Sequence, residues 1–304
     1  MNTQNMAIMI KPICDCIFHL AEGPLWNPKE QCLYWTNILN GEIWKFDENT
    51  KKSELYWRGD MMVGGFAFAA DGSMIFCSNK GIFRLPVKKG RDLFEIPGLI
   101  YEIPYEKNER FNDITTDPAG RIFAGTKTED LKNGKLWRIE KGKEPIVILD
   151  GIKISNGMTF SLDQKYFYHT DSIPCKITRY KYDIQTGDIS EPETFYQGNS
   201  STGFPDGVTL DANGNIWVAF WGASCIRCIS PAGKIIDEIE IPAIQVSSLN
   251  IGGKEMNTIF VTTACEGGFD LEKGLDEKGN FLGGFVYALP LNIKGREEWY
   301  AEVF

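Results

Sequence analysis

Short runs of β-branched, aromatic and other apolar residues recur along the whole chain, and turn signals separate them. Six of these runs, each following a turn signal, span 31–36, 73–78, 121–126, 165–170, 215–220 and 258–263. A second run follows each of them, at 41–47, 81–87, 134–140, 175–183, 225–231 and 284–290. Turn pairs such as Asp71-Gly72 and Asn213-Gly214 fall between runs, where hairpins need positive φ. No convincing amphipathic helix interrupts them, so the pattern predicts a nearly all-β chain.

The paired runs repeat at a regular spacing. Six pairs at intervals of roughly 40 to 50 residues match the period of propeller blades of about four strands each. We therefore expect a six-bladed β-propeller with four-stranded blades around a central channel. The β-compatible run at 13–20 precedes the first unit and is expected to complete the sixth blade beside 284–290, protecting that sheet edge. This closure would bring the two termini close together.

The length and the charge narrow the class of protein. The repeats fill all 304 residues without a linker or low-complexity segment, which favours a single domain over 1–304. The net charge of -9 argues against nucleic acid or an anionic membrane as partner, and it suits attraction of a cation. Without a signal-peptide pattern or a membrane-spanning run, we expect a cytoplasmic protein, monomeric or weakly dimeric, whose eight cysteines are reduced.

The inventory of catalytic motifs leaves few kinds of chemistry. His19 and His169 are the only histidines, and the chain lacks the HExxH, GxSxG, P-loop and GxGxxG motifs. His169 lies in a strand-like run, where a structural role is the stronger interpretation. Any catalysis must then rest on carboxylates, amides, arginine and a metal ion.

Four polar residues occupy the same point of four repeated units: Glu22, Asn112, Asn156 and Asp206. In a propeller these positions would converge on the central axis, where oxygen ligands can hold a hard cation. Asn156 and Asp206 each precede a glycine, so a simple turn role is the alternative for both.

The motifs around these residues resemble one family, in order and over essentially the whole chain. The matching segments are Glu22-Gly23-Pro24-Leu25-Trp26, Arg110-Phe111-Asn112-Asp113, Asp117-Pro118-Ala119-Gly120-Arg121, Ser155-Asn156-Gly157 and Pro205-Asp206-Gly207. They are similar to those of the regucalcin/gluconolactonase/luciferin-regenerating enzyme family.

This resemblance implies a six-bladed propeller with one divalent metal ion in its channel and, commonly, hydrolysis of sugar lactones. By motif, the protein ligands of the metal would be Glu22, Asn156 and Asp206. Arg110 and Asn112 would face the substrate, and Asp130, with Glu129 as its neighbour, would be an acidic substrate contact. In the second and sixth units, the positions equivalent to these metal ligands are expected to be Gly65 and Leu249, neither of which is acidic. We expect Asp113 to brace the Asn112 loop and Trp221 to be the tryptophan of the pocket wall.

Our hypothesis is a metal-dependent lactonase that opens an aldonolactone to its acid, with Asp206 as general base. The all-oxygen ligand set favours calcium, although zinc, manganese, magnesium and ferrous iron remain alternatives. Two other functions stay open at this point. One is hydrolysis of a non-sugar ester or phosphotriester on the same site, and the other is a calcium-binding propeller without turnover.

Overall fold

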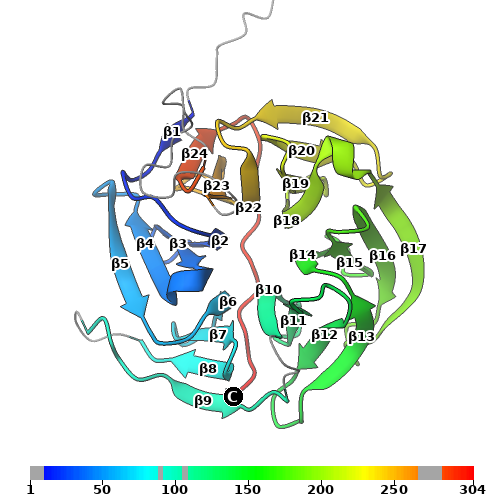
Figure 1. Ribbon diagram of the computed structural model, residues 1–304, viewed down its shortest axis with the longest axis horizontal. Helices are drawn as coiled ribbons and strands as arrows, with labels where there is room; N and C mark the ends of the chain where they lie inside the picture. Colours follow the sequence, from blue (N-terminus) through cyan, green and yellow to red (C-terminus); the bar gives the residue numbers. More distant parts are fainter. Residues whose placement is uncertain (1–9, 88–91, 105–108, 266–282) are drawn as a thin grey trace, which may run out of the picture.

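A computed structural model shows how the repeated runs assemble, and it describes residues 10–87, 92–104, 109–265 and 283–304. Six four-stranded antiparallel blades surround a central channel (Figure 1). The fold is the expected six-bladed propeller. In the part of the chain that is described, the only helices are two 3-10 turns, η1 (Ile38–Asn40) and η2 (Ser200–Thr202). None of the described helices could cross a bilayer.

Each blade runs outward from the channel through four strands. The strands next to the channel are β2 (Ala21–Asn27), β6 (Val63–Phe68), β10 (Arg110–Thr116), β14 (Ser155–Phe160), β18 (Phe204–Leu210) and β22 (Gln245–Gly252). The second strands are β3 (Cys32–Asn37), β7 (Met74–Ser78), β11 (Ile122–Lys127), β15 (Tyr166–Asp171), β19 (Ile216–Trp221) and β23 (Thr258–Ala264). The third strands are β4 (Glu42–Asp47), β8 (Gly81–Leu85), β12 (Gly134–Ile139), β16 (Lys176–Tyr182), β20 (Cys225–Ile229) and β24 (Val286–Pro290). The outer strands are β5 (Lys52–Arg58), β9 (Gly98–Tyr101), β13 (Ile146–Ile152), β17 (Ile189–Gln197), β21 (Ile235–Glu240) and β1 (Lys11–Pro12).

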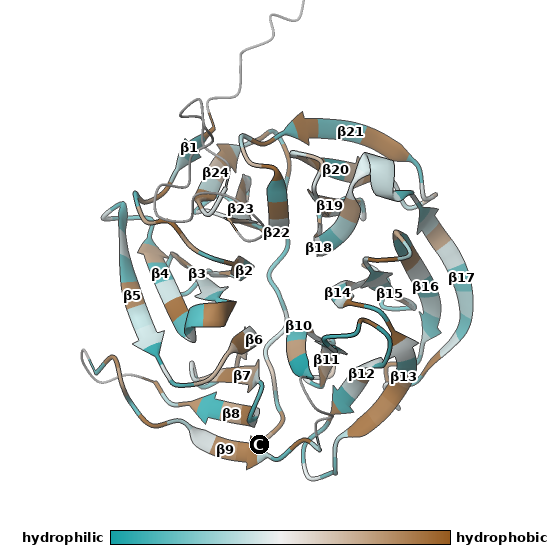
Figure 2. Ribbon diagram, in the orientation of Figure 1, coloured by the Kyte–Doolittle hydropathy of each residue, from teal (hydrophilic) through white to brown (hydrophobic). Residues whose placement is uncertain are grey.

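The hydrophobic pattern explains this layering. The second strand of a blade lies inside the sheet, and both of its faces pack on neighbouring blades. Strand β7, for example, is buried along its whole length. The outer strand β17 is mostly exposed and mostly hydrophilic (Figure 2). Aromatic side chains fill the wedges between blades, as where Phe160 contacts Phe123 and Tyr182. All eight cysteines are free, as expected.

An N-terminal strand closes the ring, but not over the predicted run 13–20. The strand that pairs with β24 is β1, only two residues long. It ends at Pro12, and beyond it the amides of Ile13 and Phe18 still donate to this segment, to the carbonyls of Val286 and Gly284. The chain then turns inward, since Phe18 is buried against Trp35 and Trp44, and it reaches the inner edge of the blade where Leu20 bridges Ala264.

The N-terminus, which was expected beside the C-terminus, lies outside the described residues, and the first described strand, β1, does not lie beside the C-terminus. After β24, residues 291–304 form a tail that crosses the ring and ends beside the second blade, far from β1 (Figure 1). Gly295 bridges Asp211 of the fifth blade, and the amide of Ala301 donates to the carbonyl of Phe68 in the second. The tail therefore ties together blades that are distant in sequence.

Candidate active site

A β-bulge lies at the same point of every inner strand. The registers shift at Glu22/Leu25, Val63/Gly65, Phe111/Asp113, Asn156/Met158, Pro205/Val208 and Val246/Ser248. A bulge bends the strand and re-aims the adjacent side chain, and bulges are common beside active sites. Here the six bulges ring the channel, so the residues at each bulge face a common axis.

The bulges change which residues of the second and sixth blades are equivalent to the candidate ligands of the other blades. In the second and sixth blades the bulged residues are Gly64 and Ser247, one and two positions before the expected Gly65 and Leu249. Neither residue carries an acidic group. The asymmetric arrangement, with potential ligands on the first, fourth and fifth blades, stays a prediction.

Asn156 and Asp206 lie inside strands rather than in turns. The glycines that follow them allow neighbouring inner strands to approach closely: a Cβ on Gly157 would lie 2.4 Å from the backbone oxygen of Asp206. A Cβ on Gly207 would lie 2.0 Å from Ser248 Oγ. The alternative of a simple turn role is therefore wrong for both residues.

A cavity of about 470 Å³ opens at this end of the channel. Its lining includes five of the six predicted site residues: Glu22, Arg110, Asn112, Asn156 and Asp206. Each of these side chains is at most 8 % exposed. The structure thus brings together residues that are up to 184 positions apart in sequence.

The two carboxylates of this cavity accept few hydrogen bonds from the described part of the protein. Glu22 accepts a hydrogen bond from the backbone amide of Gly23, and Oδ1 of Asp206 is buried without a hydrogen-bond partner among the described residues. Burial raises the pKa of Glu22 to about 8 and raises the pKa of Asp206 well above its ordinary value, and the negative charge of Glu22 adds to the effect on Asp206. Such a pair needs a nearby positive charge.

The ligand chemistry fits a hard divalent cation. Two carboxylates and an amide oxygen are the donors that such cations prefer, and they leave positions for water and substrate. Within the described ranges no three His, Cys, Asp or Glu residues gather into a metal-binding group, because the third expected ligand here is the amide of Asn156. A bound cation would supply the charge that Glu22 and Asp206 need.

Hydrogen bonds fix the orientation of the two amides. Arg110 Nη1 donates to Asn112 Oδ1 at 2.8 Å, and Asn112 Nδ2 donates to Asn156 Oδ1 at 2.6 Å. Asn156 Nδ2 donates to Ser172 Oγ at 2.8 Å. The Oδ1 of Asn156 keeps a second lone pair, which can bind a cation.

Other residues complete the wall of the cavity. Trp221 lines it, as expected, together with Phe204 and Gln245. Lys127 also lines it and was not predicted from the sequence. Its position follows from the register of one hairpin, in which Lys127 at the end of β11 pairs with Arg110 at the start of β10.

Asp130 does not line this cavity. It is exposed in the turn after β11, where its carboxylate accepts hydrogen bonds from Thr128 Oγ1 at 2.7 Å and from the amide of Lys132 at 3.2 Å. These bonds lower the pKa of Asp130, as expected for a turn-capping carboxylate. The structure therefore gives no support to the predicted substrate contact.

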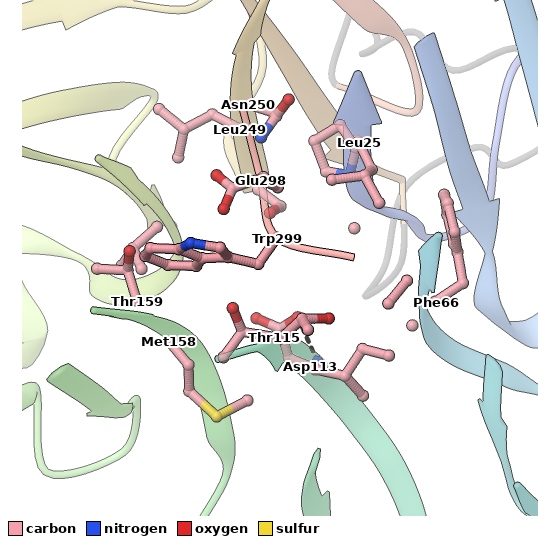
Figure 3. Close-up of a pocket in the computed structure, with 18 residues that line it drawn as sticks. Leu25, Phe66, Asp113, Thr115, Met158, Thr159, Leu249, Asn250, Glu298 and Trp299 are labelled. Atoms are coloured by element: carbon pink, nitrogen blue, oxygen red, sulfur yellow. Dashed lines mark hydrogen bonds between the residues drawn. The ribbon is translucent and has the colours of Figure 1, made fainter. Parts of the chain in front are cut away.

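A second, smaller cavity of about 70 Å³ lies deeper along the channel (Figure 3). Trp299 and Glu298 of the tail line it together with Asp113 and Thr115. Asp113 accepts from the amide of Ile114, and burial raises its pKa to about 7. Within the described part of the chain Asp113 makes no hydrogen bond to Asn112, so the expected brace is not seen. Tail residues line this cavity and, among the described residues, none of them lines the larger one, so we expect the larger cavity to be the end of the channel that substrate enters.

The fold and the site together define a propeller with a buried, carboxylate-lined cavity at one end of its channel. The chain belongs to the family described as SMP-30/gluconolactonase/LRE-like region, which matches residues 20–265. It is 31% identical over 291 residues to the pentonolactonase XacC of Haloferax volcanii, covering 96% of this chain and 97% of that protein. It is 30% identical over 286 residues to a 6-deoxy-6-sulfogluconolactonase of Pseudomonas putida, covering 92% and 94%. The crystal structure of the calcium-binding protein regucalcin from Agrobacterium tumefaciens superposes with a TM-score of 0.87 at 24% identity, covering 97% and 98%.

Proposed function

We propose that this protein is a metal-dependent lactonase that opens a sugar lactone to the corresponding aldonic acid. The observation that carries the proposal is the convergence of Glu22, Asn156 and Asp206 in one cavity, with Asp206 Oδ1 buried and unpartnered. The polar groups of Arg110 and Asn112 in the same cavity favour an enzyme, since an ion with a purely structural role would not need them. Membership of a sugar-lactonase family supports the same conclusion.

Calcium is the ion we propose for this site. All three ligand groups present oxygen, and neither cysteine nor histidine lines the cavity. A divalent cation bound there would act as a Lewis acid that polarises the lactone carbonyl.

The side chains of this protein would handle the proton and the developing charge. The water oxygen adds to the carbonyl carbon of the lactone and gives a proton to the Asp206 carboxylate. The bond between that carbon and the ring oxygen then breaks, and the ring oxygen takes the proton as it becomes a hydroxyl group.

Arg110 would stabilise the negative oxygen that forms at the carbonyl, and Asn112, whose two amide hydrogens go to Asn156 Oδ1 and to the carbonyl of Ser155, would hold Arg110 and Asn156 in position. Both are buried and held by hydrogen bonds, so little reorganisation is needed during the reaction. Such a contribution is worth about two to three powers of ten in rate. The cavity of about 470 Å³ would accommodate the sugar ring against Phe204 and Trp221.

The Asp206→Asn variant tests the role of the general base. We expect kcat to fall by about a hundredfold or more, while circular dichroism and thermal unfolding stay close to those of the parent protein. Asp237→Asn is the matched control, because Asp237 is exposed on the outer strand β21. If Asp206→Asn retained the parent kcat, the proposed base would be excluded.

A further inference from the structure

One wall of the larger cavity is apolar. Ile154 and Ile173 line it from the fourth blade, and Phe204 and Trp221 line it from the fifth. The last two residues pair across the β18–β19 hairpin. The amide of Ser172, the residue before Ile173, donates to the carbonyl of Ile154 at 3.2 Å. The four apolar side chains therefore come from two pairs of neighbouring segments on adjacent blades.

Contacts behind this wall fix its shape. Trp221 packs against the buried side chain of Leu20. The loop that leads into Phe204 is held by Arg227, whose Nη1 donates to the carbonyl of Thr202 at 2.8 Å. A wall that is already in place when a ligand arrives loses little conformational entropy on binding.

Several polar groups along the wall already have partners within the protein. The amide of Ile154 donates to Asp171 Oδ1 at 3.0 Å, and its carbonyl accepts from the amide of Ser172. The Ser172 hydroxyl donates to the carbonyl of Pro205 at 2.7 Å. A ligand hydroxyl pressed against this wall would exchange water for poorer partners, which costs free energy.

The shape of the apolar groups indicates what they would bind. Trp221 has a flat aromatic face, on which the C–H groups of a sugar ring can pack. Ile173, at 40 % exposed, and Ile154 are branched aliphatic groups without such a face. A ligand methyl group placed against them would leave water together with part of the Ile173 side chain, which favours binding. The wall therefore suits a hydroxylated ring with an apolar end.

We propose that the substrates of this site are deoxy-sugar lactones, in which the ring substituent ends in a methyl group, and that Ile173 is a specificity-determining residue that contacts this methyl group. The inference rests on the proposed lactonase function. The side of the cavity that carries carboxylates and amides would take the lactone carbonyl and the ring hydroxyls. The chain would then prefer a 6-deoxyhexonolactone to the hexonolactone with the same ring.

A matched pair of lactones tests the preference. L-Fucono-1,4-lactone and L-galactono-1,4-lactone have the same ring and configuration, and they differ at the sixth carbon, which is a methyl group in the first and a hydroxymethyl group in the second. With the calcium-loaded protein we expect kcat/KM to be about tenfold higher for the fucono-lactone, as for other apolar pockets that meet an added hydroxyl group. The two D-lactones form a second pair, so that the comparison does not depend on one configuration.

Variants at Ile173 assign the preference to its side chain. Ile173→Asn should bring the ratio of the two kcat/KM values close to one, mainly by lowering the value for the fucono-lactone. Ile173→Val should retain most of the preference, because it keeps a branched apolar group. Ile236→Asn is the matched control, since Ile236 lies exposed on the outer strand β21 and does not line the cavity.

Three results would overturn the proposal. The first is a parent protein that hydrolyses the galactono-lactones at least as well as the fucono-lactones. The second is an Ile173→Asn variant that lowers kcat/KM for both members of a pair by the same factor. The third is hydrolysis of other sugar lactones but of none of these four, which would leave the proposed lactonase function standing.

If no sugar lactone is hydrolysed, the proposed lactonase function itself fails. In that case, calorimetry of the calcium-loaded protein with L-fuconate and L-galactonate still decides the preference for a methyl group. Tighter binding of fuconate, lost in Ile173→Asn, would support the inference, and equal binding would contradict it.

Discussion

Ser172 shows how a single side chain can set the orientation of a candidate metal ligand. Its hydroxyl accepts from Asn156 Nδ2 and donates to the carbonyl of Pro205 at 2.7 Å. The same group therefore links the fourth blade to the residue before Asp206 in the fifth. These two bonds hold the amide with its oxygen facing Asn112 and the cavity.

We expect Ser172→Ala to weaken calcium binding about tenfold, as for other residues that orient a metal ligand. Without the hydroxyl, the Asn156 amide can rotate and its oxygen is no longer held toward the cavity. Calorimetric titration of chelated protein would measure the affinity without any substrate. Ser190→Ala, on the exposed outer strand, serves as control, and an unchanged affinity in Ser172→Ala would argue against the orienting role.

At the residue level, periodicity was sufficient to find the buried carboxylates and amides. Glu22, Asn156 and Asp206 each stand at the start of a repeated unit, and a ring of blades necessarily brings equivalent positions together. Lys127 and Gln245 could not be found in this way. The position of Lys127 depends on the register of the β10–β11 hairpin, and that of Gln245 depends on its pairing with Trp221 of the neighbouring blade. Asp130 was misplaced because its turn satisfies its carboxylate locally.

The bulged inner strand is the element that builds the site. Close contact between neighbouring inner strands depends on glycine at Gly157, where any side chain would meet Asp206 and Val208 of the next blade. The backbone of Gly157 does not need positive φ, so the requirement is one of space. Separating the blades here would also move Asp206.

We expect Gly157→Ala to lower the free energy of unfolding by about 1–3 kcal/mol, the usual cost of overpacking. It should also weaken calcium binding, because the Cβ pushes on the backbone of Asp206. Gly98→Ala is the matched control: Gly98 lies in the outer strand β9, its φ is not positive, and its Cβ would meet nothing closer than 4.0 Å. Urea unfolding of both variants gives the comparison, and a Gly157→Ala protein as stable as the parent would contradict this account of strand packing.

Second and third strands could be predicted to within about two residues. The second strands are buried on both faces and read as continuous apolar runs, and the third strands still alternate buried with partly buried positions. The outer strands carry mixed polar sequences and gave no equally clear signal, as the exposed β21 illustrates. The segment 13–20 reads as a strand, yet its course is set by the burial of Phe18 between two tryptophans. Tertiary packing overrides local preference there.

At the scale of the whole molecule, the tail was the largest feature that the sequence did not reveal. Residues 291–304 have no clear strand pattern, and their partners lie in blades that come much earlier in the chain. Trp299 packs against Phe160, and Arg296 stacks on the Trp299 ring. The tail lines the deeper cavity, so substrate is expected to enter the channel from the opposite end.

The stability of the whole molecule should depend on pH through His169. Burial lowers the pKa of His169 to about 4 from an ordinary value of 6.5, and its Nε2 lies 2.7 Å from Ser155 Oγ. Between these two pH values the unfolded chain binds a proton that the folded protein does not, so stability falls as pH falls from 6.5 to 4 and this effect is absent above 6.5.

This effect amounts to about 3 kcal/mol at pH 4 relative to pH 7. His169→Gln, which stays neutral and can still bond to Ser155, should lose less stability than the parent over the same range by about that amount. Denaturant unfolding of chelated samples at several pH values measures the difference. Identical pH profiles for the two proteins would show that His169 is not held in its neutral form.

The central claim is that the larger cavity of the channel is the active site of a metal-dependent sugar lactonase. Its most direct test is a pH-indicator assay of glucono-, galactono-, xylono- and arabinono-lactones with chelated and calcium-restored protein side by side. The account predicts that chelation reduces hydrolysis to the uncatalysed background and that calcium restores it for at least one lactone. Hydrolysis that is unaffected by chelation, or no hydrolysis with any divalent ion although one ion binds, would contradict it.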